Sequence, residues 1–278
     1  MTEDAPVRDH ARRSDPPASG TRTAAFFDLD KTIIATSSAT AFSRGFLAEG
    51  LLTRRNVLRT ALAQLMYLVG GADEVQTERL RANLSRTVTG WPADVVSQIV
   101  AETLHEAIDP TVYAEAVELI AEHHAAGRDV VIVSASGSEI VEPIAAVLGA
   151  DHVVATRMQV VDGRYTGEID FYAYGENKAE AIRELSGTRG YDLAECYAYS
   201  DSITDAPMLG VVGHGFAVNP DRTLRRLAVE KGWGVLSFKR PVPLFAFERE
   251  ARVAGAVVLG AAVAGTVAWW LWRRSRRR

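Results

Sequence analysis

The segment Ala24-Ala25-Phe26-Phe27-Asp28-Leu29-Asp30-Lys31-Thr32 runs from an apolar stretch into two carboxylates that are separated by one residue. The apolar stretch predicts a buried β-strand that ends at Asp28. Open α/β sheets bind ligands at the carboxyl ends of their strands, so Asp28 and Asp30 are expected at such an edge. Two buried carboxylates in close proximity repel, so one can stay protonated near neutral pH while the other acts as a nucleophile or metal ligand. Taken alone, the pattern also fits an Asp-rich turn or a helix cap.

Beyond this segment, short apolar runs alternate with amphipathic stretches. This alternation predicts an α/β fold with a Rossmann-like, doubly wound parallel sheet. The pair Asp162-Gly163, within residues 158–169, is typical of the tight turn of a β-hairpin. The expected strands lie at residues 24–28, 129–134, 152–155, 195–200 and 216–219. The expected helices lie at residues 111–126, 138–148, 176–185, 204–209 and 222–230.

Residues 37–108 interrupt the alternation, because they show helical periodicity and no convincing strand. We therefore expect an all-helical cap at 37–108, inserted into a catalytic core that is formed by residues 23–36 and 109–238. A linker at 239–252 follows the core. The helices expected in the cap lie at residues 39–48, 54–69, 74–85 and 93–107.

Three further segments place polar groups at the same edge of the sheet. Ser134 ends an apolar strand, and small residues such as Ala135 follow it, so backbone N–H groups can approach an oxyanion closely; a helix N-cap explains this serine as well. Lys178 lies near the start of a helix, where the helix dipole disfavours a cation. Either a nearby anion or exposure to solvent explains a lysine at this position. Asp201 and Asp205 bring two more acids, and four acids at one edge need a cation such as Mg²⁺.

The order of these elements resembles the haloacid dehalogenase superfamily, in particular its phosphoserine phosphatase-like branch with a helical cap. The resemblance spans residues 24–238 and rests on four motifs in sequence order. They are Asp28-Leu29-Asp30-Lys31-Thr32, Ser134, Lys178, and Asp201 with Asp205.

The resemblance implies a Mg²⁺-dependent phosphomonoester hydrolase that acts through an aspartyl-phosphate. In such an enzyme Asp28 is the nucleophile and Asp30 the general acid and base. The Asp28 carboxylate, the Asp30 backbone carbonyl and Asp201 hold the metal, and Asp205 orders the metal's shell. Phosphoryl oxygens are bound by Ser134, the adjacent Ala135 and Lys178.

The substrate is less well defined, because the chain departs from the phosphoserine phosphatase pattern at two positions. Ser37 replaces a Glu that holds the substrate ammonium, and Thr204 replaces an Asn before the last motif. We expect a phosphoserine-like or other small phosphomonoester. The alternatives are a lipid phosphomonoester carried by a membrane, transfer of the phosphoryl group to another alcohol, and a tethered phosphate-binding module without turnover.

Composition bears on disulfides, on nucleic-acid partners and on the order of the N-terminal residues. The chain has 278 residues and a single cysteine, which excludes an internal disulfide framework. Its 31 basic and 35 acidic residues give a net charge of −4, and five of the arginines lie within residues 273–278. The rest of the chain is therefore acidic, which argues against nucleic acid as a partner. Residues 1–22 contain few large apolar side chains and are expected to form a disordered arm.

Residues 253–272 contain 20 consecutive uncharged residues, enough for a helix to cross a bilayer. Trp269, Trp270 and Trp272 lie beside the basic tail 273–278, as is typical of a membrane interface. We expect membrane attachment through 253–278 with the catalytic domain on the cytoplasmic face of the cell membrane. The orientation and depth of the segment stay open, and a buried C-terminal helix is the alternative.

Overall fold

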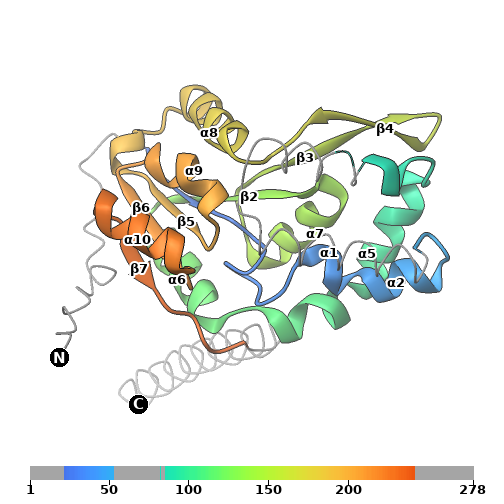
Figure 1. Cartoon of the computed structure of the whole chain (residues 1–278), viewed down its shortest axis with the longest axis horizontal. Coiled ribbons are helices and arrows are strands. Elements are labelled where there is room, and N and C mark those ends of the chain that lie inside the picture. The colour runs from blue at the N-terminus through green and yellow to red at the C-terminus, as the bar shows by residue number, and fades with distance from the viewer. Residues whose placement is uncertain (1–21, 53–81, 83–84, 242–278) are drawn as a thin grey trace, which may run out of the picture.

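A computed structural model of the protein describes residues 22–52, 82 and 85–241. Its centre is a seven-stranded sheet with the order β4-β3-β2-β1-β5-β6-β7 (Figure 1). All neighbouring strands pair in parallel except β3 and β4, which are antiparallel. The strands are β1 (Ala24–Phe27), β2 (Asp129–Gly137), β3 (His152–Val161), β4 (Arg164–Phe171), β5 (Tyr197–Ser200), β6 (His214–Val218) and β7 (Gly234–Leu236).

The central strand, β1, is buried on both faces, and its side chains alternate between two hydrophobic cores. Ala24 and Phe26 belong to the core on one face, and Ala25 and Phe27 belong to the core on the other. The first core is covered by α8 (Glu176–Arg189), α9 (Ala206–Gly210) and α10 (Arg222–Lys231), and the second by α6 (Ala114–Ala125) and α7 (Ser138–Leu148). This arrangement confirms the expected α/β class and explains the near-continuous apolar sequence of β1.

β1 is also the point at which the strand order changes direction. The chain after β1 leads to β2 on one side, and β5 pairs with β1 on the other. Ligands of open α/β sheets bind at such switch points, beyond the carboxyl ends of the strands. The residues that follow β1 therefore occupy the position in the fold that is best suited to a site.

The inserted segment after β1 is helical where the structure describes it. It comprises α1 (Ser38–Ala41), α2 (Ser43–Ala48) and α5 (Ala93–Ile108). Buried residues of these helices, such as Phe46 and Ile99, belong to the same hydrophobic core as Phe27 of the sheet. The predicted helix at 54–69 lies outside the described residues, as does most of the one at 74–85.

The β-hairpin predicted at Asp162-Gly163 is present, but its first strand is longer than expected. β3 continues to Val161 instead of ending at residue 155, and both turn residues have positive φ angles of 51° and 75°. The hairpin contacts the inserted segment, since the Gly90 N–H donates to the Tyr165 carbonyl at 2.8 Å. The sequence did not indicate this length because the outer half of β3 is not a regular apolar run.

Several predicted boundaries shift because short 3-10 helices replace parts of strands and helices. The strand predicted from residue 195 begins at Tyr197, after a 3-10 turn at Leu193–Glu195. The helix predicted at 204–209 divides into a 3-10 turn at Ile203–Asp205 and α9. The helix predicted from residue 111 begins at Ala114, because Val112 and Tyr113 pair with the segment after β1 instead.

After β7, which the sequence did not predict, residues 238–241 cross to the start of α6; we call these residues the C-terminal strap. The Ala114 N–H donates to the Arg240 carbonyl at 2.8 Å, and Tyr113 pairs with Pro241. Tyr113 N–H in turn donates to the Ile33 carbonyl at 2.9 Å. The strap thus lies beside the connection between the core and the inserted segment.

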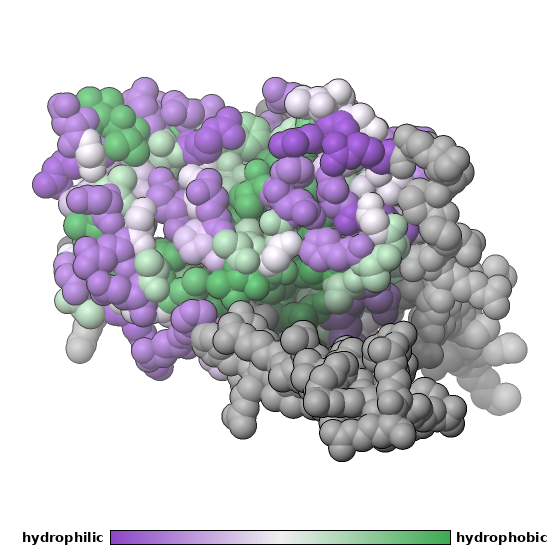
Figure 2. Space-filling model, turned by 180° about the vertical axis from the view of Figure 1, so that it is seen from behind, coloured by the Kyte–Doolittle hydropathy of each residue, from purple (hydrophilic) through white to green (hydrophobic). Residues whose placement is uncertain are grey.

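Polar side chains cover much of the face that Figure 2 shows, and apolar side chains gather in a band across its lower middle. The exposed large hydrophobic residues include Val160 and Val161 on the hairpin and Val229 on α10. No helix among the described residues is long and apolar enough to span a membrane. The predicted membrane segment at 253–272, the basic tail at 273–278 and nearly all of the predicted arm at 1–22 lie outside those residues.

Candidate active site

Asp28 directly follows β1, and its backbone continues the parallel ladder for one more residue. The Asp28 N–H donates to the Tyr199 carbonyl of β5 at 2.9 Å. The chain then turns tightly, with the N–H groups of Thr32, Ile33 and Ile34 all directed at the Leu29 carbonyl. Lys31 has a φ of 61°, the left-handed conformation that such a turn requires. This turn fixes the direction of the Asp28 carboxylate at the edge of the sheet.

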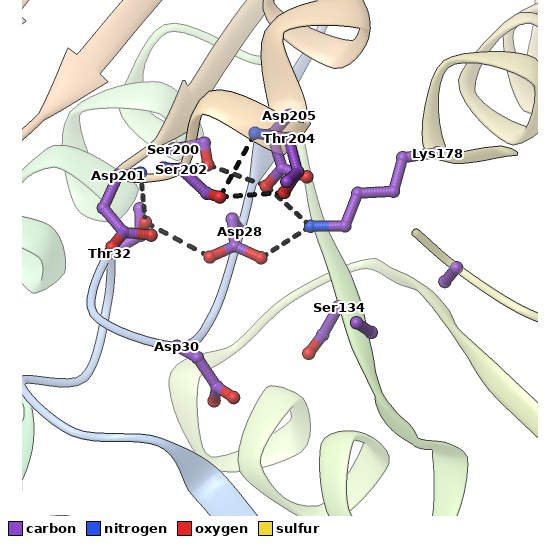
Figure 3. A network of polar contacts seen from close by, with 12 residues as sticks. Asp28, Asp30, Thr32, Ser134, Lys178, Ser200, Asp201, Ser202, Thr204 and Asp205 are labelled. Carbon is purple, nitrogen blue, oxygen red and sulfur yellow. Dashed lines mark hydrogen bonds and ion pairs between the residues drawn. The ribbon is translucent and has the colours of Figure 1, made fainter. Parts of the chain in front are cut away.

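Lys178 joins Asp28 to Asp205 in a buried ion-pair network (Figure 3). Its ammonium nitrogen lies 2.7 Å from Asp28 Oδ1 and 2.8 Å from Asp205 Oδ2. The three residues are 6%, 2% and 2% exposed for Asp28, Lys178 and Asp205, respectively. Burial opposes the charge on Lys178, but Asp205 and Asp28 raise its pKa above the ordinary value. Lys178 is therefore a permanently charged group between two acids.

The carboxylates carry more negative charge than this lysine neutralises. Burial raises the pKa of Asp28 well above its ordinary value, and repulsion from Asp205 and Asp201 adds to the effect, while Lys178 opposes it. Burial likewise raises the pKa of Asp201 to about 6, against the pull of Lys31. An additional cation at this edge would favour the ionised form of both acids.

Hydroxyl groups hold the acids in place. Thr32 Oγ1 donates to Asp28 Oδ2 at 3.3 Å and accepts the Asp201 N–H at 3.0 Å, so it ties the turn after β1 to the turn after β5. Ser200 Oγ donates to Asp205 Oδ2 at 2.7 Å and accepts the Ser202 N–H at 3.1 Å. With Lys178, these contacts account for both oxygens of Asp28.

Asp30 and Ser134 lie on the other side of Asp28 (Figure 3). Asp30 Oδ1 accepts the N–H of Ser38, the first residue of α1, at 2.9 Å. Burial raises the pKa of Asp30 above its ordinary value, and the hydrogen bond from Ser38 partly offsets this rise. Ser134 is buried at 1% exposure, and its Oγ accepts the Ser136 N–H at 3.2 Å.

The structure thus places the predicted residues on the turns that follow β1 and β5, on β2, and at the start of α8. It joins Asp28, Lys178 and Asp205 directly, and it brings Asp201 to Asp28 through Thr32. Ala135 lies beside Ser134 in β2, and its carbonyl accepts the Thr156 hydroxyl at 2.8 Å. Sequence analysis assigned no role to Ser38, Ser136 or Ser200. A serine spaced two residues from Ser134 was the only signal for Ser136, because positions two apart in a strand share a face.

The haloacid dehalogenase-like hydrolase family matches residues 25–210, which include every one of these positions. The chain belongs to this family. The resemblance read from the four motifs is therefore confirmed at the level of the superfamily.

Relatives of this hydrolase cover most of its length. A protein of Streptomyces azureus named for inhibition of morphological differentiation is 58% identical over 264 residues, covering 92% of this chain and 95% of its own. A probable phosphatase of Mycobacterium tuberculosis is 55% identical and covers 95% and 96%. A phosphoserine phosphatase of the same organism is 35% identical and covers 84% and 77%.

Among solved structures, a Bordetella pertussis protein of unknown function shares the fold. It has a TM-score of 0.64 and 30% identity, and the match covers 78% of this chain and 98% of that chain.

The donor set at the edge of the sheet fits Mg²⁺. Within the described part of the chain, no group of three or more His, Cys, Asp or Glu side chains is arranged to hold a metal ion. The predicted site needs only two carboxylates, from Asp28 and Asp201, with the Asp30 carbonyl as a third oxygen. Both carboxylates are buried acids whose pKa values are raised. Hard oxygen donors with unbalanced negative charge are what Mg²⁺ binds.

Proposed function

We propose that this hydrolase removes the phosphoryl group from a phosphomonoester through an aspartyl-phosphate on Asp28, with Mg²⁺ as its metal. One observation carries the proposal: the Asp28 carboxylate is fixed between a buried lysine and Thr32 at the switch point of the sheet. A carboxylate that served only structure would gain nothing from sharing that lysine with Asp205 while Asp201 adds further repulsion. The family match and the relatives that are named phosphatases support the same reaction.

The first half of the reaction is a displacement at phosphorus. An oxygen of Asp28 forms the bond to phosphorus as the bond to the leaving oxygen breaks. Lys178 and Ser134 stabilise the negative charge on the phosphoryl oxygens. Asp30 gives its proton to the leaving oxygen, so the product is a neutral alcohol and Asp30 becomes a carboxylate.

The second half regenerates the nucleophile. The Asp30 carboxylate takes a proton from water as the water oxygen attacks the phosphorus of the aspartyl-phosphate. The bond between phosphorus and Asp28 breaks, and inorganic phosphate leaves. When bound, Mg²⁺ neutralises charge between the phosphate and the nucleophile, and Asp28, Asp201 and the Asp30 carbonyl would hold it.

A small phosphomonoester related to phosphoserine is the substrate class that we propose. The 35% identical relative named phosphoserine phosphatase supports this class. Ser37, the N-cap of α1, is uncharged and offers no counter-ion to a substrate ammonium, so a substrate without an amino group is compatible with the site. The second candidate is a lipid phosphomonoester, which the uncharged segment 253–272 favours.

The test is phosphate release by the full chain in lipid, with Mg²⁺ and a panel of L-phosphoserine, glycerol phosphate, sugar phosphates and lysophosphatidate. Asp28→Asn is expected to abolish turnover. Asp94→Asn, at an exposed acid in the first turn of α5, is the matched control and should retain it. Mass analysis of the products separates free phosphate from a phosphorylated second alcohol. Absence of turnover on every substrate would favour the phosphate-binding module instead.

Membrane attachment through 253–278, with the catalytic domain on the cytoplasmic face, belongs to the same proposal. Its support is the uncharged 20-residue segment that ends in tryptophans beside five arginines. Flotation with anionic vesicles tests it: the full chain should float, and a chain that ends at residue 252 should stay at the bottom of the gradient. If both chains behave alike, the segment does not attach the protein to membranes.

A further inference from the structure

Asp30 is held by two serines that come from different parts of the chain. The Ser38 N–H donates to Asp30 Oδ1 at 2.9 Å, and Ser136 Oγ donates to Asp30 Oδ2 at 3.5 Å. The two serine hydroxyl oxygens are 2.7 Å apart, within hydrogen-bond distance of each other. Asp30 and the two serines therefore form a closed ring of contacts.

The ring joins three segments of the fold. Asp30 lies in the turn after β1, Ser38 is the first residue of α1 in the inserted segment, and Ser136 lies near the end of β2. Ser38 is fully buried at 0% exposure. Its hydroxyl contacts Ser136 Oγ, and its side chain also hydrogen-bonds to Asp30, so protein groups take the place of water.

The direction of the Asp30 carboxylate suits a group that acts on the leaving oxygen. In Figure 3 it points away from Asp28. In an in-line displacement the leaving oxygen lies opposite the attacking oxygen, so a proton donor must reach past the phosphoryl group instead of facing the nucleophile. The two serines favour that direction, because the Ser38 N–H binds one carboxylate oxygen at 2.9 Å and Ser136 Oγ makes a longer contact with the other at 3.5 Å.

We propose that Ser38 and Ser136 are positioning residues for Asp30, and that their hydroxyl pair keeps hold of this carboxyl group in both halves of the reaction. The proposal rests on the function proposed above. A hydroxyl both donates and accepts, so Ser136 donates to the Asp30 carboxylate and accepts from the protonated acid. The Ser38 N–H can only donate, so it binds an accepting oxygen of Asp30 in either form but offers no acceptor to the acid's proton.

Proton transfer to the leaving oxygen matters for an alkyl ester, because an alkoxide leaves poorly without a proton. It matters little for p-nitrophenyl phosphate, since nitrophenolate leaves unprotonated. Ser136→Ala should therefore slow single-turnover phosphoryl transfer from the best alkyl phosphate of the panel by about tenfold or more. The burst of nitrophenolate from p-nitrophenyl phosphate should stay within about twofold of the wild-type rate, because that step needs no acid.

Four variants accompany Ser136→Ala, and one of them is Ser38→Ala alone. Ser136→Thr retains a hydroxyl and should restore most of the rate with the alkyl ester. In Ser38→Ala combined with Ser136→Ala, the loss should be smaller than the product of the two single losses, because the hydroxyls act as a pair. Ser43→Ala removes an exposed hydroxyl that bonds to the Thr40 carbonyl on the same inserted segment, and it should leave both rates unchanged.

The outcomes separate this inference from the proposed function. If the wild-type chain releases phosphate and Ser136→Ala lowers the two rates equally, or lowers neither, the positioning role is wrong while the hydrolase stands. If the wild-type chain turns over no substrate, both proposals fall together. A large fall in the alkyl rate with a retained burst and rescue by Ser136→Thr supports the positioning role.

Discussion

At the scale of single residues, Lys178 decides the electrostatics of the site. It is a buried cation with two carboxylate partners, and each partner is itself buried. Removing one member of a buried charge network leaves the other charges unpaired, and this strongly destabilises the fold. The intact network, by contrast, contributes little stability relative to apolar residues in the same place. Lys178 therefore allows Asp28 and Asp205 to be buried together, and the proposed reaction requires it as well.

Lys178→Met should lower the turnover number by about 10²-fold or more, because it removes a donor to the phosphoryl oxygens. It should also destabilise the fold by about 3–5 kcal/mol at neutral pH, since Asp28 and Asp205 then face each other without a cation. The free energy of unfolding in urea measures the second effect. Lys231→Met, at an exposed lysine that ends α10, is the control. A Lys178→Met protein as stable as wild type would show that the two acids do not depend on this cation.

His123 is a second residue with a strong environmental effect. Arg128 Nε donates to His123 Nδ1 at 2.8 Å, so the neutral ring carries its proton on Nε2 and directs it at the Tyr199 hydroxyl, also at 2.8 Å. Burial lowers the pKa of His123 to about 3, and the nearby charge of Arg128 adds to this effect. The folded protein therefore excludes the protonated form.

Below the unfolded pKa of about 6.5 the unfolded chain gains a proton on His123 that the folded protein excludes. The free energy of unfolding is therefore unaffected by His123 above that pH and decreases as the pH falls toward 3. At pH 5 the loss is about 2 kcal/mol relative to pH 7.5. In urea unfolding, the His123 loss is measured as the difference between the pH dependence of wild type and that of His123→Gln, because the buried acids with raised pKa values contribute in the opposite direction. Lys231→Gln, at an exposed lysine that ends α10, is the control and should keep the wild-type dependence. Equal pH dependence in wild type and His123→Gln would contradict the assignment.

At the scale of elements, the C-terminal strap is fastened to α6 mainly by one side chain. Glu115 accepts the N–H groups of Lys239 and Arg240 at 3.1 and 3.2 Å, as well as the Arg240 guanidinium. Glu118 contacts only the Arg240 guanidinium, and both partners of that contact are exposed. The two acids are one helical turn apart, but only Glu115 satisfies backbone groups of the strap.

Glu115→Ala should therefore destabilise the protein by about 1–2 kcal/mol, because two backbone donors lose a charged acceptor. Glu118→Ala should have a much smaller effect, since exposed ion pairs contribute little. Chemical unfolding of both variants measures the difference. Hydrogen exchange at Lys239 and Arg240 should increase in Glu115→Ala and not in Glu118→Ala. Equal effects of the two substitutions would mean that the strap is held by its backbone pairing with α6 alone.

At the scale of the whole molecule, the inserted segment and the sheet share one hydrophobic core. Phe46 and Ile99 of the insert belong to the same cluster as Phe27 and Ile132 of the sheet. A shared core favours unfolding in a single cooperative transition. The site lies at the junction of these parts, so a ligand that binds it stabilises both.

Mg²⁺ should raise the thermal midpoint of that single transition, because an ion that binds only the folded state stabilises it. Chelation should abolish phosphate release and reverse the shift. In Asp201→Asn, which lacks one of the two carboxylate donors, the midpoint should no longer respond to Mg²⁺. Asp94→Asn should respond like wild type. A midpoint that is unaffected by Mg²⁺ in the wild-type chain would contradict the proposed metal site.

Local patterns determined much of this protein. The apolar run of β1 with its two acids, the helix at 138–148, which the structure reproduces at Ser138–Leu148, and the turn at Asp162-Gly163 all depend on neighbouring residues. Periodicity and turn chemistry act over a few residues, so a sequence displays them directly. The order of the four motifs then indicated the superfamily and the edge of the sheet at which Asp28 lies.

Only the tertiary structure decided which groups meet. Lys178 is 150 positions from Asp28 along the chain, and Ser136 is 106 from Asp30, yet each pair is in contact. Likewise, the three residues of β7 are too few to show a period, and the strap beside α6 depends on a helix more than a hundred residues earlier. Sequence shows which side chains a segment offers, but burial and pairing between distant segments arise only when the chain folds, and they determine the charge of each acid in the site.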